Sequence, residues 1–373
     1  MRVAMDARYL IGKGSGIGNY TLNLARAMLD QDPGLELLMV RRGPEGQRLD
    51  HPRVEEVCFP FHPLSPVTRL ALGHFMRPYS FDLFHSTCDM SPGGLRQPLV
   101  ATVHDINWIV NPAYNTSNRL MQVVLGNFYK WNLDATMRDA SSILTVSRSS
   151  RRSIVEYAPW YEPKVRVTYN AVDGSYVHPV PRDEAFGAIS HILPEGTPFV
   201  LTMGHSSPHK NHLNAVRGFL QAFAHRPEYR MVLVRRLPKR EGALQRLLDS
   251  PEGREKVITL PHVPEEVLNA LLNAARVYLH PSYYEGFGIP LLEAMVAGTP
   301  VVTSTVSAMP EIVGDAALLA SPADPAALAE ALRRVDSDDE LRERLVQAGH
   351  RRHREFTWAR TARTTLEAYR EVV

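Results

Sequence analysis

A glycine-rich turn between two glutamates is the segment of this sequence best suited to chemistry. Glu285 and Glu293 are separated by seven residues, which begin with Gly286, Phe287, Gly288 and Ile289. Pro290 suits the first turn of a helix, so the amides around Phe287 are predicted to lie at a helix N-terminus, where they can bind a phosphate or sugar oxygen. Each carboxylate can accept a pair of sugar hydroxyls. The alternatives without a ligand are a solvated loop acid for Glu285 and a helix-dipole carboxylate in the first helical turn for Glu293.

A second polar loop, from Gly204 to His212, follows the first strand predicted in the C-terminal half. Lys210 is predicted to lie near the start of the next helix, where its charge can neutralise a diphosphate. The loop also contains three histidines, which suggest a zinc site. They would share one helix face only if the segment were helical, and Pro208 disfavours a helix there. We therefore expect no metal at this loop.

Four glycines fall within Gly12–Gly18, after the first predicted strand and before a helix predicted from about Asn19. Glycine allows positive φ and close backbone approach, and a helix N-terminus offers amide donors, so Gly16 and Gly18 are candidate phosphate contacts. The spacing fits neither the dinucleotide fingerprint nor the P-loop. A flexible surface turn is the alternative, but the position after a first strand favours ligand contact.

A buried-strand run from Val100 ends at the ionisable pair His104-Asp105. A histidine at the carboxyl end of a parallel strand can donate to a sugar hydroxyl or transfer a proton. His104 is therefore a candidate catalytic residue, with a hydrogen-bonded structural histidine as the alternative.

The elements that must position these loops alternate between short apolar or β-branched runs and segments of helical period. Strands are predicted over Val3–Ala7, Leu35–Val40, Val54–Phe59, Leu83–Ser86, Leu99–His104, Ile143–Ser147, Phe199–Gly204, Met231–Arg235, Val257–Leu260, Val277–Pro281, Val301–Ser304 and Ala317–Ala320. Helices are predicted over Tyr20–Asp30, about 118–139, Pro290–Ala297 and Pro325–Val335. Nearly continuous apolar strands are typical of parallel sheets with both faces covered.

Proline and glycine accumulate between Tyr169 and Pro198, which predicts a connector, and the alternation then restarts. The length of 373 residues suits two domains. We predict an α/β protein with two Rossmann-like, doubly wound parallel-sheet domains, residues 1–180 and 181–355, and a C-terminal helix in 356–373 that packs back toward the N-terminal domain.

Composition excludes several classes of function. The net charge of +2 gives no electrostatic basis for binding nucleic acid. Two cysteines, Cys58 and Cys88, exclude a disulfide framework and a cysteine zinc site. The start is unlike a signal peptide and no apolar run is long enough to span a bilayer, so we expect a cytoplasmic protein. Leu341–Arg370 carries eight arginines and three glutamates, which fits a solvated helix face or a weak peripheral contact with the inner face of the plasma membrane.

The segment Glu285–Met295 resembles the Glu-x7-Glu signature of the retaining family-4 glycosyltransferases, which have the GT-B fold. Further matches follow in order along nearly the whole chain: Ser15–Gly18, Phe84–Ser86, Thr102–Asp105, Thr145–Ser147, Asn170–Asp173, Gly298–Val302 and Met309–Asp315. The pattern is most similar to bacterial mannosyltransferase-like members that elongate polysaccharides, often O-antigen chains.

The resemblance implies a role for each candidate residue. Glu293 would bind the ribose hydroxyls of a nucleotide, while Glu285 and the amides after it would hold the donor sugar and the diphosphate. Lys210 would stabilise the leaving diphosphate, Gly16 and Gly18 would approach the phosphates, and His104 would contact the donor sugar. The loop near His262 and Val263 would meet the base.

This sequence departs from the family pattern where many relatives carry an arginine, because His205 or Ser206 stands there. Neutralisation of the phosphates would then rest on Lys210, on protonated His205 or on Arg235. The resemblance implies a metal-independent, retaining hexosyltransferase with no cofactor, a nucleotide-sugar donor (GDP-mannose) and a saccharide or polyprenyl-linked saccharide acceptor. The alternatives are a nucleotide-sugar epimerase of the same architecture and a non-catalytic nucleotide-sugar-binding partner subunit.

Overall fold

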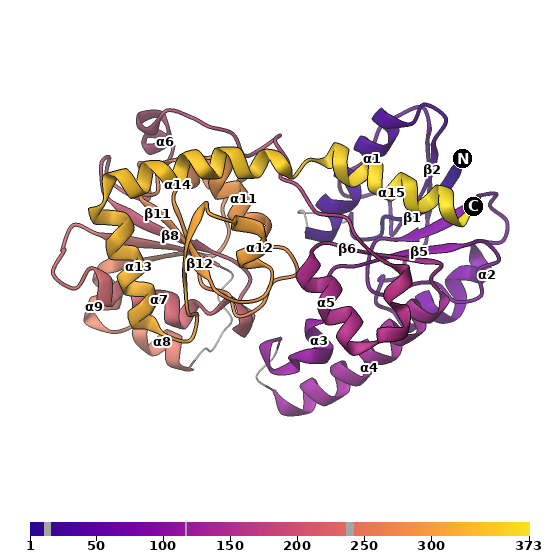
Figure 1. Cartoon of the computed structure of the whole chain (residues 1–373), viewed down its shortest axis with the longest axis horizontal. Coiled ribbons are helices and arrows are strands. Elements are labelled where there is room, and N and C mark those ends of the chain that lie inside the picture. The colour runs from indigo at the N-terminus through magenta and orange to yellow at the C-terminus, as the bar shows by residue number, and fades with distance from the viewer. Residues whose placement is uncertain (11–15, 116–117, 236–241) are drawn as a thin grey trace. The chain divides into compact units, whose positions relative to one another are not determined.

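The computed structural model describes residues 1–10, 16–115, 118–235 and 242–373. The chain divides into two compact units. Unit 1 comprises Met1–Pro112, Asn118–Ala171 and Phe356–Val373, and unit 2 comprises Ala113–Ser117 and Val172–Glu355. Each unit is built around one parallel sheet with helices packed beside it (Figure 1).

Unit 1 has a seven-stranded sheet in the order β3-β2-β1-β4-β5-β6-β7, with every pair of neighbours parallel. The strands are β1 (Arg2–Asp6), β2 (Glu36–Arg41), β3 (Val54–Cys58), β4 (Leu83–Ser86), β5 (Leu99–Val103), β6 (Ser142–Thr145) and β7 (Val165–Val167). The helices are α1 (Gly16–Gln31), the π-helix η1 (Thr68–Leu72), α2 (Gly73–Phe75), α3 (Asn107–Val110), η2 (Pro112–Tyr114), α4 (Arg119–Asp139), α5 (Arg148–Tyr157), η3 (Pro159–Lys164) and α15 (Trp358–Val372).

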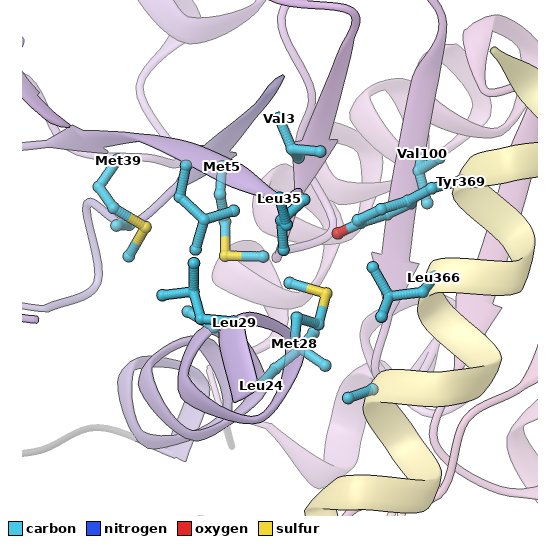
Figure 2. Packing of buried hydrophobic residues seen from close by; sticks show 14 of the residues in the cluster. Val3, Met5, Leu24, Met28, Leu29, Leu35, Met39, Val100, Leu366 and Tyr369 are labelled. Atoms are coloured by element: carbon cyan, nitrogen blue, oxygen red, sulfur yellow. The ribbon is translucent and has the colours of Figure 1, made fainter. Parts of the chain in front are cut away.

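The C-terminal helix α15 completes the core of unit 1. Figure 2 shows Leu366 and Tyr369 of α15 beside Met28 of α1 and Val3 of β1 in one buried apolar cluster. The side-chain amide of Gln31 also donates to the carbonyl of Ala359 over 2.6 Å. Helix α15 therefore buries an apolar stripe and leaves its arginines exposed on the opposite face, as in any amphipathic helix.

Unit 2 has a six-stranded parallel sheet in the order β10-β9-β8-β11-β12-β13. The strands are β8 (Phe199–Met203), β9 (Arg230–Val234), β10 (Val257–Leu260), β11 (Val277–His280), β12 (Val301–Ser304) and β13 (Ala317–Ala320). The helices are α6 (Arg182–Ala188), η4 (Pro208–Lys210), α7 (His212–Ala222), α8 (Gly242–Leu248), α9 (Pro251–Lys256), α10 (Glu265–Ala274), α11 (Ile289–Val296), α12 (Met309–Val313), α13 (Pro325–Ser337), α14 (Asp339–Arg352) and η5 (His353–Glu355).

These sheets confirm the predicted fold class of two doubly wound α/β domains. All twelve predicted strands form, and each of their ends lies within two residues of the prediction. The three-residue edge strand β7 was too short to leave a pattern. Within the described ranges, every helix is too short or too polar to cross a bilayer.

Two local predictions were wrong. The segment between Tyr169 and Pro198 is not only a connector, because it contains α6, whose Ala185 and Phe186 are buried. Asp183 and Glu184 in its first turn complement the helix dipole and help to start the helix after Pro181. Helix α1 begins at Gly16 rather than at Asn19.

Candidate functional site

The centre of the unit 2 sheet brings two polar loops together. Strands β8 and β11 pair side by side there, with Val277 opposite Val200. The chain order reverses direction between these two strands, and ligands of doubly wound sheets bind at such a point, beyond the carboxyl ends of the strands. The loop after β8 contains Lys210 and the loop after β11 contains Glu285.

Lys210 and Glu285 form the central ion pair of this site. The Lys210 Nζ donates to Glu285 Oε1 over 2.7 Å and to Oε2 over 3.0 Å. Their side chains are 15% and 10% exposed, so water screens the pair only weakly. Two further donors reach Glu285 Oε1: Ser282 Oγ over 2.7 Å and His280 Nε2 over 2.9 Å.

The partners of Glu285 keep its carboxylate ionised. Burial alone would raise the pKa of Glu285, but the charge of Lys210 and the hydrogen bond from His280 outweigh it and hold the pKa well below its usual range. The interpretation of Glu285 as a solvated loop acid is therefore wrong.

The turn after Glu285 requires glycine at one position. Gly288 is the N-cap of α11 and has φ 96° and ψ 51°, in the left-handed region. A Cβ at this position would lie 3.0 Å from Leu291 Cδ1. Phe287 is buried beside it, 3% exposed, and Pro290 lies in the first turn as predicted. The backbone from Gly286 to Ile289 thus leads directly into a helix N-terminus.

Glu293 lies deeper in α11 than predicted. It is the fifth residue of the helix and so belongs to the second turn, and the first turn carries no acidic residue. Only 5% of Glu293 is exposed. Because it lies beyond the first turn, the helix-dipole interpretation of this carboxylate was wrong.

Glu293 has the opposite electrostatic environment to Glu285. Its carboxylate accepts from the hydroxyl of Tyr176, and no lysine or arginine among the described residues pairs with it. Burial raises the pKa of Glu293 to about 7, although the Tyr176 hydroxyl opposes the rise. The pKa values of the two glutamates thus shift in opposite directions, because Lys210 lies beside Glu285 whereas burial dominates at Glu293.

The histidines of the loop after β8 do not converge. His205 is exposed and its Nδ1 lies 2.7 Å from Ser207 Oγ. His209 Nδ1 lies 3.1 Å from the carbonyl of Tyr114, and the buried His212 bonds through Nε2 to the carbonyl of His205 over 3.1 Å. In the described part of the chain, no three histidine, cysteine or acidic side chains form a group that could hold a metal.

A cavity of about 630 Å³ lies beside this loop. Arg217 and the buried Arg235 line it, together with Ser206 and Asn214. The two guanidinium groups make the cavity suited to an anion. Farther along the sheet, His262 is exposed and Val263 is buried in the loop between β10 and α10.

His104, Gly16 and Gly18 belong to unit 1. His104 follows β5, and its Nε2 lies 3.0 Å from the carbonyl of Thr87, which is an acceptor only. The Nε2 must therefore carry a proton. Burial lowers the pKa of His104 to about 4, so the ring is neutral at neutral pH and its Nδ1 is an acceptor. The sequence predicted that His104 could donate to a sugar hydroxyl or transfer a proton, and in this tautomer the nitrogen left for a ligand, Nδ1, is an acceptor.

The sequence predicted a ligand-facing loop at Gly16 and Gly18, whereas in the structure both glycines lie in helix α1. Gly16 and Gly18 are the first and third residues of the helix, and neither has positive φ. Gly16 is exposed, whereas Gly18 is buried. Their amides lie in the first turn, whose N–H groups lack intrahelical acceptors. Gly12 and Gly14 lie outside the described residues.

Sequence reasoning missed three side chains that contact the two glutamates: Tyr176, His280 and Ser282. Tyr176 lies 117 residues from Glu293 and left no local signal. His280 and Ser282 did leave one, since they are polar residues at alternate positions where an apolar strand ends.

Comparisons with known proteins identify the family of this chain. Residues 14–176 match the family model "Glycosyltransferase Family 4", and residues 188–352 match "Glycosyl transferases group 1". The O-antigen chain mannosyltransferase B of Escherichia coli is 28% identical over 95% of this chain and 96% of its own. The α-maltose-1-phosphate synthase of Mycolicibacterium smegmatis is 31% identical over 66% of this chain and 68% of its own.

The chain belongs to the family-4 glycosyltransferases.

Solved structures place this glycosyltransferase in the GT-B fold. HepE from Anabaena, in a structure containing UDP-glucose, superimposes with a TM-score of 0.77 at 18% identity and covers 100% of both chains. Sucrose-phosphate synthase from Thermosynechococcus elongatus superimposes with a TM-score of 0.75 at 20% identity, over 99% of this chain and 98% of its own. The family membership confirms the resemblance stated above and makes this protein a hexosyltransferase.

Proposed function

We propose that this glycosyltransferase moves mannose from GDP-mannose to a saccharide or polyprenyl-linked saccharide, with retention of the anomeric configuration and without a metal. The mannosyl donor and polysaccharide acceptor are supported by the similarity to an O-antigen mannosyltransferase along nearly the full length of both chains. The rest of the proposal is supported by the polar side chains of unit 2.

The Lys210–Glu285 ion pair is the observation that carries the proposal. Glycosyl transfer from a nucleotide sugar builds negative charge on the departing diphosphate and positive charge on the anomeric carbon. A buried ammonium beside a helix N-terminus stabilises the first charge. A buried carboxylate that stays ionised can hold a sugar hydroxyl near the second. Lys210 and Glu285 supply these two groups.

The hydrogen bonds of Glu285 support a reaction without a metal. Hard cations bind carboxylate oxygens that are open to them. Oε1 already accepts from Lys210, Ser282 and His280, and Oε2 lies 3.0 Å from the ammonium of Lys210. The positive charge of Lys210 also lies where it would repel a cation.

Glu293 and His104 fit two further roles. Glu293 is proposed to accept the ribose hydroxyls of the nucleotide, in exchange for the hydroxyl of Tyr176. Hydroxyl donors favour the ionised carboxylate, so nucleotide binding would lower the pKa of Glu293 from about 7. In unit 1, His104 is proposed to accept a hydrogen bond through Nδ1 from a hydroxyl of the donor sugar.

A thermal-shift panel of GDP-mannose, UDP-glucose, dTDP-glucose and ADP-glucose, with and without EDTA, tests the proposed donor. A ligand at 100 times its dissociation constant adds about 2.7 kcal/mol to the stability of the folded state. We expect the largest stabilisation from GDP-mannose, unchanged by EDTA. Release of GDP that requires an added mannan acceptor, and an α-linkage in the product by NMR, would complete the assignment. Isomerisation of the donor without an acceptor would contradict it.

A further inference from the structure

The carboxylate of Glu285 is held by a chain of two buried side chains on β11. Tyr278 and His280 are alternate residues of the strand, so both side chains stand on the same face of the sheet. They are 0% and 2% exposed. The hydroxyl of Tyr278 lies 2.9 Å from His280 Nδ1, and His280 Nε2 lies 2.9 Å from Glu285 Oε1.

The positions of the protons follow from the chemistry of the partners. An ionised carboxylate only accepts, so His280 Nε2 must carry the proton in its bond to Glu285. In the neutral ring Nδ1 is then an acceptor, and the hydroxyl of Tyr278 donates to it. Ser282 Oγ, 3.2 Å from Nε2, donates its own proton to Glu285 Oε1. With a neutral His280 ring, the polar hydrogens of Tyr278, His280 and Ser282 each have an acceptor.

The two oxygens of Glu285 are used unequally. Oε1 accepts from Lys210, Ser282 and His280, whereas among the described residues Oε2 accepts from Lys210, over 3.0 Å. A carboxylate oxygen has two lone pairs, so Oε2 retains acceptor capacity. His280 and Ser282 therefore fix which of the two oxygens can receive a new hydrogen bond.

The backbone of Glu285 is held separately from its side chain. Its N–H donates to Ser307 Oγ over 3.1 Å, and Ser307 Oγ donates to its carbonyl over 2.8 Å. Removing the imidazole would leave this clamp in place. Loss of the His280 imidazole should therefore change the orientation of the Glu285 carboxylate rather than the path of the loop.

We propose that Tyr278 and His280 are positioning residues: Tyr278 donates to Nδ1 and orients the ring of His280, and His280 holds Glu285 Oε1 through Nε2–H so that Oε2 accepts a hydroxyl of the donor sugar. This inference rests on the proposed role of Glu285 toward the donor. It adds a tautomer-specific relay that acts through Glu285 and touches no substrate.

The tautomer is tested without any substrate. Long-range ¹H–¹⁵N NMR spectra of the full chain labelled at histidine distinguish the two neutral tautomers, and the signal missing in His280→Gln assigns His280. At pH 7.5 we expect the Nε2–H form in the wild type, and in Tyr278→Phe the same form with a shifted Nδ1 signal, because Nδ1 loses the hydroxyl that donates to it. An Nδ1–H form in the wild type, or an unchanged signal in Tyr278→Phe, would overturn the relay.

Kinetics with GDP-mannose test the effect on Glu285. His280→Leu removes the donor, whereas His280→Gln keeps an N–H near the position of Nε2. We expect His280→Leu to lower kcat about tenfold or more, with the Kd of GDP changed less than about twofold, and His280→Gln to recover most of the loss. Equal losses in both variants would assign His280 a packing role and refute the proposal.

Unit 1 offers a matched control. Tyr369 and His85 are another buried pair, with the hydroxyl 2.6 Å from Nδ1, but His85 Nε2 bonds to Thr102 rather than to a carboxylate. Tyr369→Phe should cost about as much stability as Tyr278→Phe while leaving kcat within about twofold of wild type.

If the wild type turns over no nucleotide sugar, the proposed function fails, but the NMR experiment still decides the relay.

Discussion

Replacing Glu293 with glutamine should make the protein more stable while it weakens nucleotide binding. Glu293 is buried, its pKa is raised to about 7 from an ordinary value of 4.5, and no cation pairs with it among the described residues. Because the folded state holds this proton more tightly than the unfolded chain does, stability falls as the pH rises from about 4.5 to 7 and stays reduced above that range. Glutamine keeps an acceptor for Tyr176 and never ionises.

The size of the effect follows from the two pKa values. At about 1.36 kcal/mol per pKa unit, the difference between 4.5 and about 7 corresponds to about 3 kcal/mol at pH 8.5. At pH 5 the same linkage gives a destabilisation by Glu293 of less than about 1 kcal/mol, because the carboxyl is then protonated in the folded state. For a domain of the size of unit 2, about 3 kcal/mol corresponds to a rise in Tm of roughly 6–12 °C.

Scanning calorimetry of the full chain at pH 8.5 and pH 5 measures the difference. Glu255→Gln is the matched control, because Glu255 is an exposed glutamate on α9 of the same unit. We expect Glu293→Gln to raise the Tm at pH 8.5 and to lose most of that gain at pH 5, while Glu255→Gln changes little at either pH. A gain that is absent at pH 8.5, or equal at the two pH values, would refute the reasoning from burial.

Three further predictions concern other residues of the two units. Lys210→Met should abolish measurable GDP binding in calorimetry and destabilise the protein by about 3–5 kcal/mol, because it leaves the Glu285 carboxylate buried without its cation; wild-type affinity would remove Lys210 from the site. His104→Ala should keep the Kd of GDP and lose turnover, and a wild-type rate would make His104 a structural residue. Gly288→Ala should lower stability by about 1–3 kcal/mol in thermal denaturation, since φ 96° is strained for any residue with a Cβ; an unchanged Tm would contradict the need for glycine.

The tertiary structure decided the properties that the sequence left open at the two glutamates. Lys210 is 75 residues from Glu285, and Tyr176 is 117 residues from Glu293. A pKa depends on burial and on neighbouring charges, and both come from segments that are distant in the chain. The spacing of the glutamates predicted their place around a helix start but could not predict that the pKa of Glu285 would be lowered and that of Glu293 raised.

The sequence by itself determined the architecture and the position of the two candidate loops of unit 2. Strand and helix periods are local properties of the chain, so the alternation of apolar runs and helical segments predicted two parallel sheets, and Gly288 and Pro290 marked the start of α11. Local sequence patterns gave wrong predictions where the burial of side chains determined the structure. Helix α6 forms inside a segment rich in proline and glycine because Phe186 and Ala185 are buried, and α1 extends back to Gly16 despite its glycines. Tautomers, charge states and the pairing of distant loops follow from the folded environment, because they depend on which groups burial brings within hydrogen-bonding distance.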